Sequence, residues 1–242
     1  MAKNIAVIFA GGTGQRMGNQ DCPKQFMTVY GKPIIIYTLE KYQQNARIHG
    51  IVIACLESWI DHCKQIVSEY RMDKVAAVVP GGTTGQKSIY NGLKKAAELY
   101  GEDNIVLVHD GVRPLIDQDT IDRAILCAES HGNAITVSPA VETVTLKNQN
   151  GLIETILDRS LCTLAKAPQC FRLKDILAAH RKAYQEGLDN FIDSAMLMSH
   201  YGAKLFTIEG NDENLKLTKQ VDIQIFKAIL DSSGKNEMET NE

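Results

Sequence analysis

Short apolar runs alternate with segments of helical periodicity along most of the chain, and this alternation limits the possible folds more than any other feature. The runs are continuous, rich in β-branched residues and bounded by glycine or polar residues, which is typical of strands buried on both faces. We expect strands at residues 5–9, 51–56, 75–79, 105–109, 134–138 and 205–208. Helices are expected at residues 33–44, 59–70, 85–100, 119–131 and 173–185. This order predicts an α/β protein with a Rossmann-like, doubly wound and mostly parallel sheet.

One segment breaks this rhythm. Two short β-prone runs at residues 143–146 and 152–156 flank Lys147-Asn148-Gln149-Asn150-Gly151, and no helical segment separates them. The Asn-Gly pair is a strong signal for a tight hairpin turn. We therefore expect a β-hairpin arm that projects from the sheet at about residues 141–158. Because an isolated hairpin is marginally stable in water, the arm is expected to pack on a second subunit in a homodimer.

The length and composition favour one domain and argue against several classes of partner. The 242 residues suit a single domain at residues 1–230, followed by a polar tail at 231–242 that is expected to be disordered. Lys and Arg number 26 against 29 Asp and Glu, so no broad positive field is available and nucleic acid is not an expected partner.

Location can also be predicted from the sequence. No run approaches the roughly 18–20 apolar residues of a membrane span, so no membrane partner is expected. The apolar run at residues 5–10 is too short for a signal peptide. No two of the six cysteines have the spacing C-x-x-C, which disfavours a zinc site and favours reduced thiols. A cytoplasmic protein is expected.

A glycine-rich turn follows the first expected strand, in the sequence Ala10-Gly11-Gly12-Thr13-Gly14-Gln15-Arg16-Met17-Gly18. Such a turn lets backbone N–H groups approach phosphates, and the carboxyl ends of parallel strands are where open α/β folds bind ligands. Arg16 lies within the turn, and Lys24 follows Pro23, which restricts the backbone before it. Two cations held beside an anion-binding turn suit the triphosphate of a nucleotide.

Two common nucleotide motifs fail in this sequence. The dinucleotide pattern G-x-G-x-x-G has Met17 at its third glycine, which disfavours a dinucleotide-dependent oxidoreductase. The phosphate-loop pattern has a near match at residues 80–88, but Gln86 stands between Gly85 and Lys87. A non-catalytic nucleotide-binding regulator is a further alternative, which the retained cations disfavour.

The motif A-G-G-x-G-x-R-M-G, followed by P-K-Q-F, resembles the opening of the small cytidylyltransferases. This family includes the methylerythritol-phosphate cytidylyltransferases of isoprenoid synthesis and the ribitol-5-phosphate cytidylyltransferases of teichoic-acid and capsule synthesis. Further matches are Gly81-Gly82, Ser88, His109-Asp110-Gly111-Val112-Arg113-Pro114, Ala167-Pro168-Gln169-Cys170-Phe171, Asp193-Ser194-Ala195 and Asn214-Leu215-Lys216-Leu217-Thr218. The resemblance spans residue 5 to about residue 230 and implies a nucleotidyltransferase fold.

The resemblance implies transfer of CMP from CTP to a polyol phosphate, with release of pyrophosphate. The acceptor phosphate is already anionic, so catalysis reduces to positioning and neutralisation of charge. The resemblance assigns catalysis to three cations, Arg16, Lys24 and Lys216. It assigns nucleotide contacts to Ala10, Gly11, Gly12, Gly14, Gly82, Ser88 and Asp110. It also implies Mg²⁺ as cofactor, with Asp110 as the main carboxylate and Glu213 as a second.

Departures from the family motifs bear on the acceptor. Val141 stands where the isoprenoid enzymes have an arginine that binds the acceptor phosphate, and an apolar residue cannot replace it. The ribitol-phosphate enzymes are similar to this chain at Val141, so the resemblance favours D-ribitol 5-phosphate over 2-C-methyl-D-erythritol 4-phosphate. Gly85 differs from both branches, which tend to have arginine there, and Lys87 is expected to compensate. The remaining candidates for acceptor contacts are Arg113, Thr143, Asp193 and Thr218.

Overall fold

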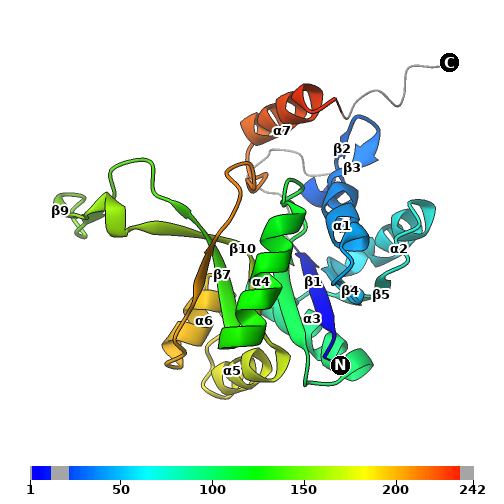
Figure 1. The fold of residues 1–242 in the computed structure, drawn as a ribbon, viewed down its shortest axis with the longest axis horizontal. Coiled ribbons are helices and arrows are strands. Elements are labelled where there is room, and N and C mark those ends of the chain that lie inside the picture. The colour runs from blue at the N-terminus through cyan, green and yellow to red at the C-terminus, as the bar shows by residue number, and fades with distance from the viewer. Residues whose placement is uncertain (1, 12–21, 235–242) are drawn as a thin grey trace.

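The computed structural model describes residues 2–11 and 22–234, and its centre is a seven-stranded sheet (Figure 1). The strands follow the order β11-β7-β10-β6-β1-β4-β5 across the sheet. Their bounds are β1 Asn4–Ala10, β4 Gly50–Cys55, β5 Val75–Pro80, β6 Ile105–Asp110, β7 Asn133–Pro139, β10 Thr163–Arg172 and β11 Thr207–Glu209. Only β10 runs antiparallel to its neighbours among these strands, so the expected mostly parallel sheet is confirmed.

Helices cover both faces of the sheet (Figure 1). Their bounds are α1 Ile34–Gln44, α2 Ile60–Glu69, α3 Gly85–Tyr100, α4 Gln118–His131, α5 Leu173–Gln185, α6 Ser194–His200 and α7 Gln220–Ser232. Neighbouring residues of β1 point to opposite faces, because Ile8 belongs to the same core cluster as Leu39 of α1, whereas Val7 belongs to the cluster that contains Leu93 of α3. Burial on both faces explains why the strand sequences are continuously apolar. Within the described residues, no helix combines the length and apolar character needed to cross a bilayer.

The five expected helices and six expected strands are confirmed, with boundaries that differ by a few residues. The structure adds β10, α6, α7 and a short hairpin of β2 (Thr28–Val29) and β3 (Lys32–Pro33) before α1. β10 contains Pro168, which has no N–H for the ladder, and its register with β7 shifts between Ala165 and Gln169. The expected start of the tail at residue 231 is wrong, because α7 continues through Ser232. Residues 235–242 of the expected tail lie outside the described residues.

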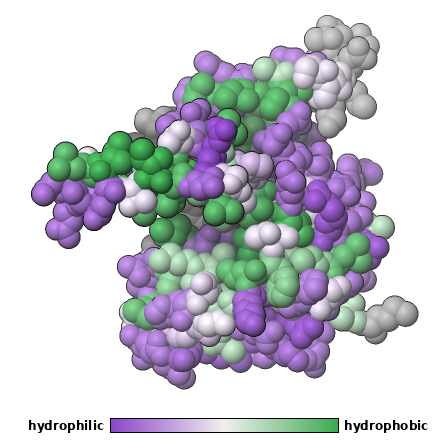
Figure 2. All heavy atoms as spheres, turned by 60° about the vertical axis from the view of Figure 1, so that its left-hand side comes forward, coloured by the Kyte–Doolittle hydropathy of each residue, from purple (hydrophilic) through white to green (hydrophobic). Residues whose placement is uncertain are grey.

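The expected arm is confirmed as a separate two-stranded sheet of β8 (Thr145–Lys147) and β9 (Ile153–Ile156), which projects from the body (Figure 1). Gly151 adopts a φ of 81° in its turn, a conformation that favours glycine. Apolar side chains gather along one side of the arm (Figure 2). Those that are at least half exposed are Val141, Leu146, Leu152, Ile153, Ile156, Leu161 and Leu164.

Candidate active site

Those predicted nucleotide-binding residues that the structure describes lie along the carboxyl edge of the parallel strands. Ala10 ends β1 and Asp110 ends β6, while Gly81 directly follows β5. The Gly81 N–H donates to the Cys55 carbonyl at the end of β4, with N and O 2.6 Å apart. The Gln25 side chain donates to the Ala10 carbonyl at 2.6 Å. The first strand end and the loop after β5 are therefore fixed against this edge by hydrogen bonds.

Ser88 of α3 packs against both glycine loops. Its buried hydroxyl accepts from the Gly82 N–H at 3.0 Å and donates to the Thr84 carbonyl at 3.0 Å. A Cβ at Gly11 would lie 2.7 Å from the Ser88 oxygen, and a Cβ at Gly82 would collide with the Lys87 side chain. Close approach of backbone therefore requires glycine at both positions. The Ser88 hydroxyl already joins loop hydrogen bonds, and its contact with cytidine stays a prediction.

Lys24 lies on the short helix η2 (Lys24–Phe26) and reaches the segment that leads into α7. Its Nζ is 3.4 Å from the Thr218 carbonyl oxygen. The Thr218 N–H and hydroxyl both donate to Oδ2 of Asp222, at 2.6 and 2.9 Å. This contact places Lys24 beside Thr218, although the two residues are far apart in the sequence. Gly12, Gly14 and Arg16 lie outside the described residues.

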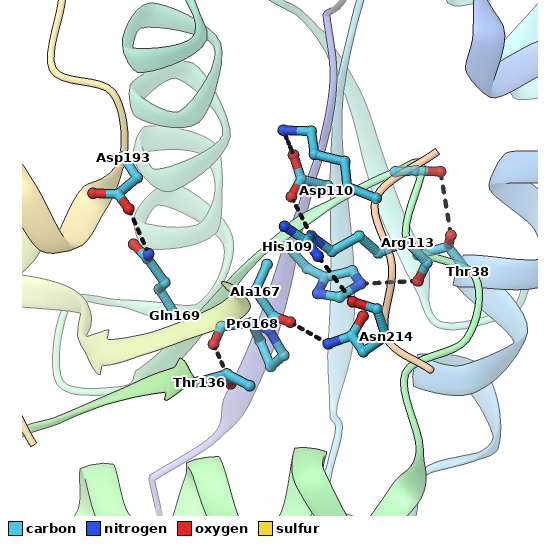
Figure 3. A network of polar contacts seen from close by, with 12 residues as sticks. Thr38, His109, Asp110, Arg113, Thr136, Ala167, Pro168, Gln169, Asp193 and Asn214 are labelled. Carbon is cyan, nitrogen blue, oxygen red and sulfur yellow. Dashed lines mark hydrogen bonds and ion pairs between the residues drawn. The ribbon is translucent and has the colours of Figure 1, made fainter. Parts of the chain in front are cut away.

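Asp110 is the centre of a buried charge network (Figure 3). Its Oδ2 is 2.8 Å from Nε of Arg113, and its Oδ1 is 2.5 Å from Nζ of Lys216. Arg113 also donates through Nη1 to the Asn214 carbonyl at 3.0 Å. Burial raises the pKa of Asp110, but Lys216 and Arg113 together lower it by more, so the net pKa lies below its ordinary value. Asp110 is therefore ionised near neutral pH and holds both cations in place.

His109 precedes Asp110 but has a different environment. It is fully buried, its ring lies 5.2 Å from the Tyr42 ring, and its Nε2 donates to the Arg113 carbonyl at 3.2 Å. Burial is the main cause that lowers the pKa of His109 to about 4. A neutral, buried ring bonded to backbone gives His109 a structural role near the end of β6 and does not suit acid–base chemistry.

A cavity of about 360 Å³ opens beside this network, between β6, β10, α3 and the start of α6. The charged and amide side chains that line it are Asp110, Arg113, Lys166, Gln169, Asp193 and Lys216. Asp193 begins α6, where Oδ1 accepts from the Met196 N–H at 2.8 Å and Oδ2 accepts from Gln169 Nε2 at 3.0 Å. The polar wall of the cavity is therefore held by hydrogen bonds.

Comparison with known proteins identifies the family. The family model described as "IspD: 2-C-methyl-D-erythritol 4-phosphate cytidylyltransferase" matches residues 4–232. The chain belongs to this cytidylyltransferase family. A ribitol-5-phosphate cytidylyltransferase of Vibrio parahaemolyticus is 48% identical over 95% of this chain and 96% of the relative. A 2-C-methyl-D-erythritol 4-phosphate cytidylyltransferase of Clostridium acetobutylicum is 38% identical over 94% of this chain and 97% of the relative.

Solved structures of cytidylyltransferases share the fold. The crystal structure of 4-diphosphocytidyl-2C-methyl-D-erythritol synthase from Anaerococcus prevotii gives a TM-score of 0.81 at 26% identity. That match covers 95% of this chain and 99% of the other. This agreement and the family match set aside the dinucleotide-dependent oxidoreductase as an alternative.

Several residues predicted for the cytidylyltransferase site do not line the cavity. Thr143 is exposed at the base of the arm, and Thr218 faces Lys24 and Asp222. Glu213 is exposed, and the described residues contain no cluster of three or more His, Cys, Asp or Glu that could hold a metal ion. Lys87 pairs with Asp189, with Nζ and Oδ2 3.1 Å apart, and does not line the cavity. The expectation that Lys87 compensates for Gly85 therefore finds no support in the described residues.

Three residues that line the cavity or support its wall were not predicted from the sequence. Gln86 is buried and binds the segment before Asp193, because Nε2 donates to the Leu188 carbonyl at 3.0 Å and Oε1 accepts from the Phe191 N–H at 2.9 Å. Gln169 orients Asp193, and Lys166 lines the cavity. The motif Ala167-Pro168-Gln169 could have pointed to Gln169, but neither Gln86 nor Lys166 carries a local signal.

Proposed function

We propose that the protein transfers CMP from CTP to D-ribitol 5-phosphate and forms CDP-ribitol and pyrophosphate. The observation that carries this proposal is the cavity at the end of β6, where Asp110 holds Arg113 and Lys216. Family membership supports the reaction class. The 48% identity to a ribitol-5-phosphate cytidylyltransferase supports the acceptor, as does the aliphatic Val141.

The chemistry needs little from the protein besides position and charge. An oxygen of the acceptor phosphate attacks the α-phosphorus of CTP, the bond to the β-phosphate breaks, and pyrophosphate leaves. The nucleophile is already an anion, so no general base is required. Lys216 and Arg113 stabilise the charge that develops on the transferred phosphoryl group, and Asp110 fixes both cations before the substrates arrive.

Mg²⁺ is the proposed cofactor, and Asp110 is the residue suited to hold it. Its carboxylate is ionised and lines the cavity, and within the described residues each oxygen contacts one cation, so it has acceptor capacity left for a metal ion. Magnesium in nucleotide sites commonly takes only one or two carboxylates and completes its shell with phosphates and water. Glu213, which is exposed, is a weaker second candidate. When bound, the ion would neutralise charge on the triphosphate.

A homodimer through the arm is also proposed. The exposed apolar residues of the arm form a surface that a stable monomer rarely presents to water. Deletion of residues 146–153 should convert the dimer to a monomer in light scattering, and an unchanged dimer would contradict this role of the arm. The six free cysteines and the use of CTP support a cytoplasmic enzyme whose product, CDP-ribitol, carries activated ribitol phosphate for a wall or capsule polysaccharide.

The proposal is tested by measuring pyrophosphate release with CTP, Mg²⁺ and a panel of polyol phosphates, with ATP, GTP and UTP as controls. Release with ribitol 5-phosphate and CTP is expected. Release with 2-C-methyl-D-erythritol 4-phosphate alone would overturn the acceptor and favour the alternative that the 38% identical relative represents. CTP binding in calorimetry without release from any polyol phosphate would instead indicate a non-catalytic regulator.

A further inference from the structure

Lys166 lies on β10 at a point where the pairing of this strand with its neighbours is interrupted. Pairing of β10 with β7 stops after Ala165 and begins again at Gln169, where pairing with β6 also begins. Residues 166–168 therefore form no strand pairs with β6 or β7. This backbone is nevertheless fixed, because the Ala167 carbonyl accepts from Asn214 Nδ2 at 2.7 Å and the Pro168 carbonyl accepts from Thr136 Oγ1 at 2.6 Å (Figure 3). The base of the Lys166 side chain is therefore held rigidly at the cavity wall.

The side chains that line the cavity include one more cation than carboxylate. Three cations, Arg113, Lys166 and Lys216, line it together with two carboxylates, Asp110 and Asp193. Asp110 accepts from Arg113 and Lys216, and both oxygens of Asp193 already accept hydrogen bonds. Within the part of the chain that the structure describes, the Lys166 ammonium has neither an ion pair nor a hydrogen bond.

The surroundings of Lys166 disfavour its charge unless an anion is bound. Burial lowers the pKa of Lys166 and the charge of Arg113 lowers it further, while Asp212 acts in the opposite direction. An anion between Lys166 and Arg113 would reverse this effect, since an opposite charge at close range stabilises the ammonium. In the proposed reaction, a phosphate dianion is the group that could lie between Lys166 and Arg113 in the cavity and stabilise the ammonium charge.

We propose that Lys166 binds the phosphate group of the acceptor, the role that an arginine at the position of Val141 would otherwise have. This inference rests on the proposed function. The acceptor is favoured over the triphosphate because, among the described residues expected to contact the nucleotide, Asp110 lines this cavity but Ala10, Gly11, Gly82 and Ser88 do not, whereas the acceptor candidates Arg113 and Asp193 and the neighbouring Gln169 all line it. The Asp193 oxygens and the Gln169 amide suit the hydroxyl groups of a polyol.

The test is a comparison of kinetic constants for wild type, Lys166→Met and Lys166→Arg, measured by pyrophosphate release. Lys166→Met should raise KM for ribitol 5-phosphate by about 10- to 100-fold, the loss typical of one hydrogen bond to a charged group, and leave KM for CTP unchanged. Lys166→Arg should restore part of the loss, because it keeps the charge. Lys174→Met is the matched control, since Lys174 is exposed on α5 beside residues 102–103, away from the cavity.

The possible outcomes separate this inference from the proposed function. An active wild type with an unchanged acceptor KM in Lys166→Met would overturn the inference alone, as would a rise only in KM for CTP. If no polyol phosphate releases pyrophosphate, the proposed function fails, and titration calorimetry with ribitol 5-phosphate decides the inference. Weaker binding by Lys166→Met than by wild type and Lys174→Met then supports it, and equal binding overturns it. Thermal unfolding of each variant checks that the fold is retained.

Discussion

Nζ of Lys216 lies 2.5 Å from Oδ1 of Asp110, and this contact joins the segment before α7 to the carboxyl end of β6, which is far away in the sequence. The lysine is half exposed and the aspartate is buried, so the pair presents a fixed positive group at the cavity. Such a preorganised cation stabilises charge without reorganisation during the reaction.

Lys216→Met should therefore reduce kcat by roughly 10²-fold, the loss found when one charge-stabilising donor is removed. Lys216→Arg keeps the charge and should lose less. The measurement is pyrophosphate release at saturating CTP and acceptor. A Lys216→Met variant with wild-type kcat would show that the ion pair serves only the fold.

Lys24→Ala and Arg16→Ala should each reduce turnover by roughly 10²-fold, on the same argument of charge stabilisation. For Lys24, the contact with the Thr218 carbonyl places the cation on the side of the site that also carries Lys216. For Arg16, the prediction rests on the sequence motif, since that residue lies outside the described part. Steady-state kinetics with varied CTP measures the loss, and full activity in either variant would remove that cation from the site.

Much of this fold follows from local sequence patterns. Ile8 and Val7 of β1 point into opposite clusters, so both must be apolar, and the same requirement produces the continuous runs of β4 and β6. Asp110 could be placed at the ligand edge because it ends one of these runs. Burial on both faces thus leaves a signal in the sequence that predicts the parallel strands and, with them, the location of the site.

The parts that were not predicted depend on contacts between distant segments. β10 is central and antiparallel, but Pro168 and the register shift beside it conceal the strand. Lys166 faces a cavity only because β10 lies between β6 and β7. α7 was missed because its N-terminal contacts come from Asp222, which accepts from the Lys219 N–H at 2.7 Å, and lysine is no usual start signal for a helix.

His180 gives the stability a pH dependence. It is buried, stacks on Tyr90 at 5.4 Å, and neither ring nitrogen has a hydrogen-bond partner within the described residues. Burial lowers the pKa of His180 from 6.5 to about 4. Between these pH values the unfolded chain binds more protons than the folded one, so stability falls as pH decreases from 6.5 towards 4.

His180→Phe keeps an aromatic ring and removes this protonation. The free energy of unfolding should then depend less steeply on pH across that window, by ~1.4 kcal/mol per pH unit. Urea unfolding at several pH values measures the slope. Equal slopes in variant and wild type would contradict a neutral, buried His180.

Gly82 and Gly85 should respond oppositely to alanine, although they lie in one loop. A Cβ at Gly82 meets the Lys87 side chain and backbone, so Gly82→Ala should destabilise the protein by about 1–3 kcal/mol. A Cβ at Gly85 meets nothing within 4 Å, and this position begins α3, so Gly85→Ala should stabilise by about 0.4–1 kcal/mol. Thermal unfolding compares the pair, and equal effects would contradict the packing described for this loop.

Gln86 connects α3 to the segment that carries Asp193. Its amide donates to the Leu188 carbonyl and accepts from the Phe191 N–H, and the side chain is buried. Gln86→Leu has a similar size but leaves both backbone groups without their partner, which should lower the free energy of unfolding by about 1–3 kcal/mol. Because residues 188–191 lead directly to Asp193, the same variant should also raise KM for the acceptor.

Gln185→Leu is the matched control for this change, because Gln185 is exposed at the end of α5 and does not line the cavity. It therefore tests for a general effect of replacing an amide by an apolar side chain. Urea unfolding and acceptor kinetics are measured for both variants, and Gln86→Leu should change both quantities while Gln185→Leu changes neither. If Gln86→Leu lowers stability while KM for the acceptor stays at the wild-type value, Gln86 supports the fold without positioning Asp193.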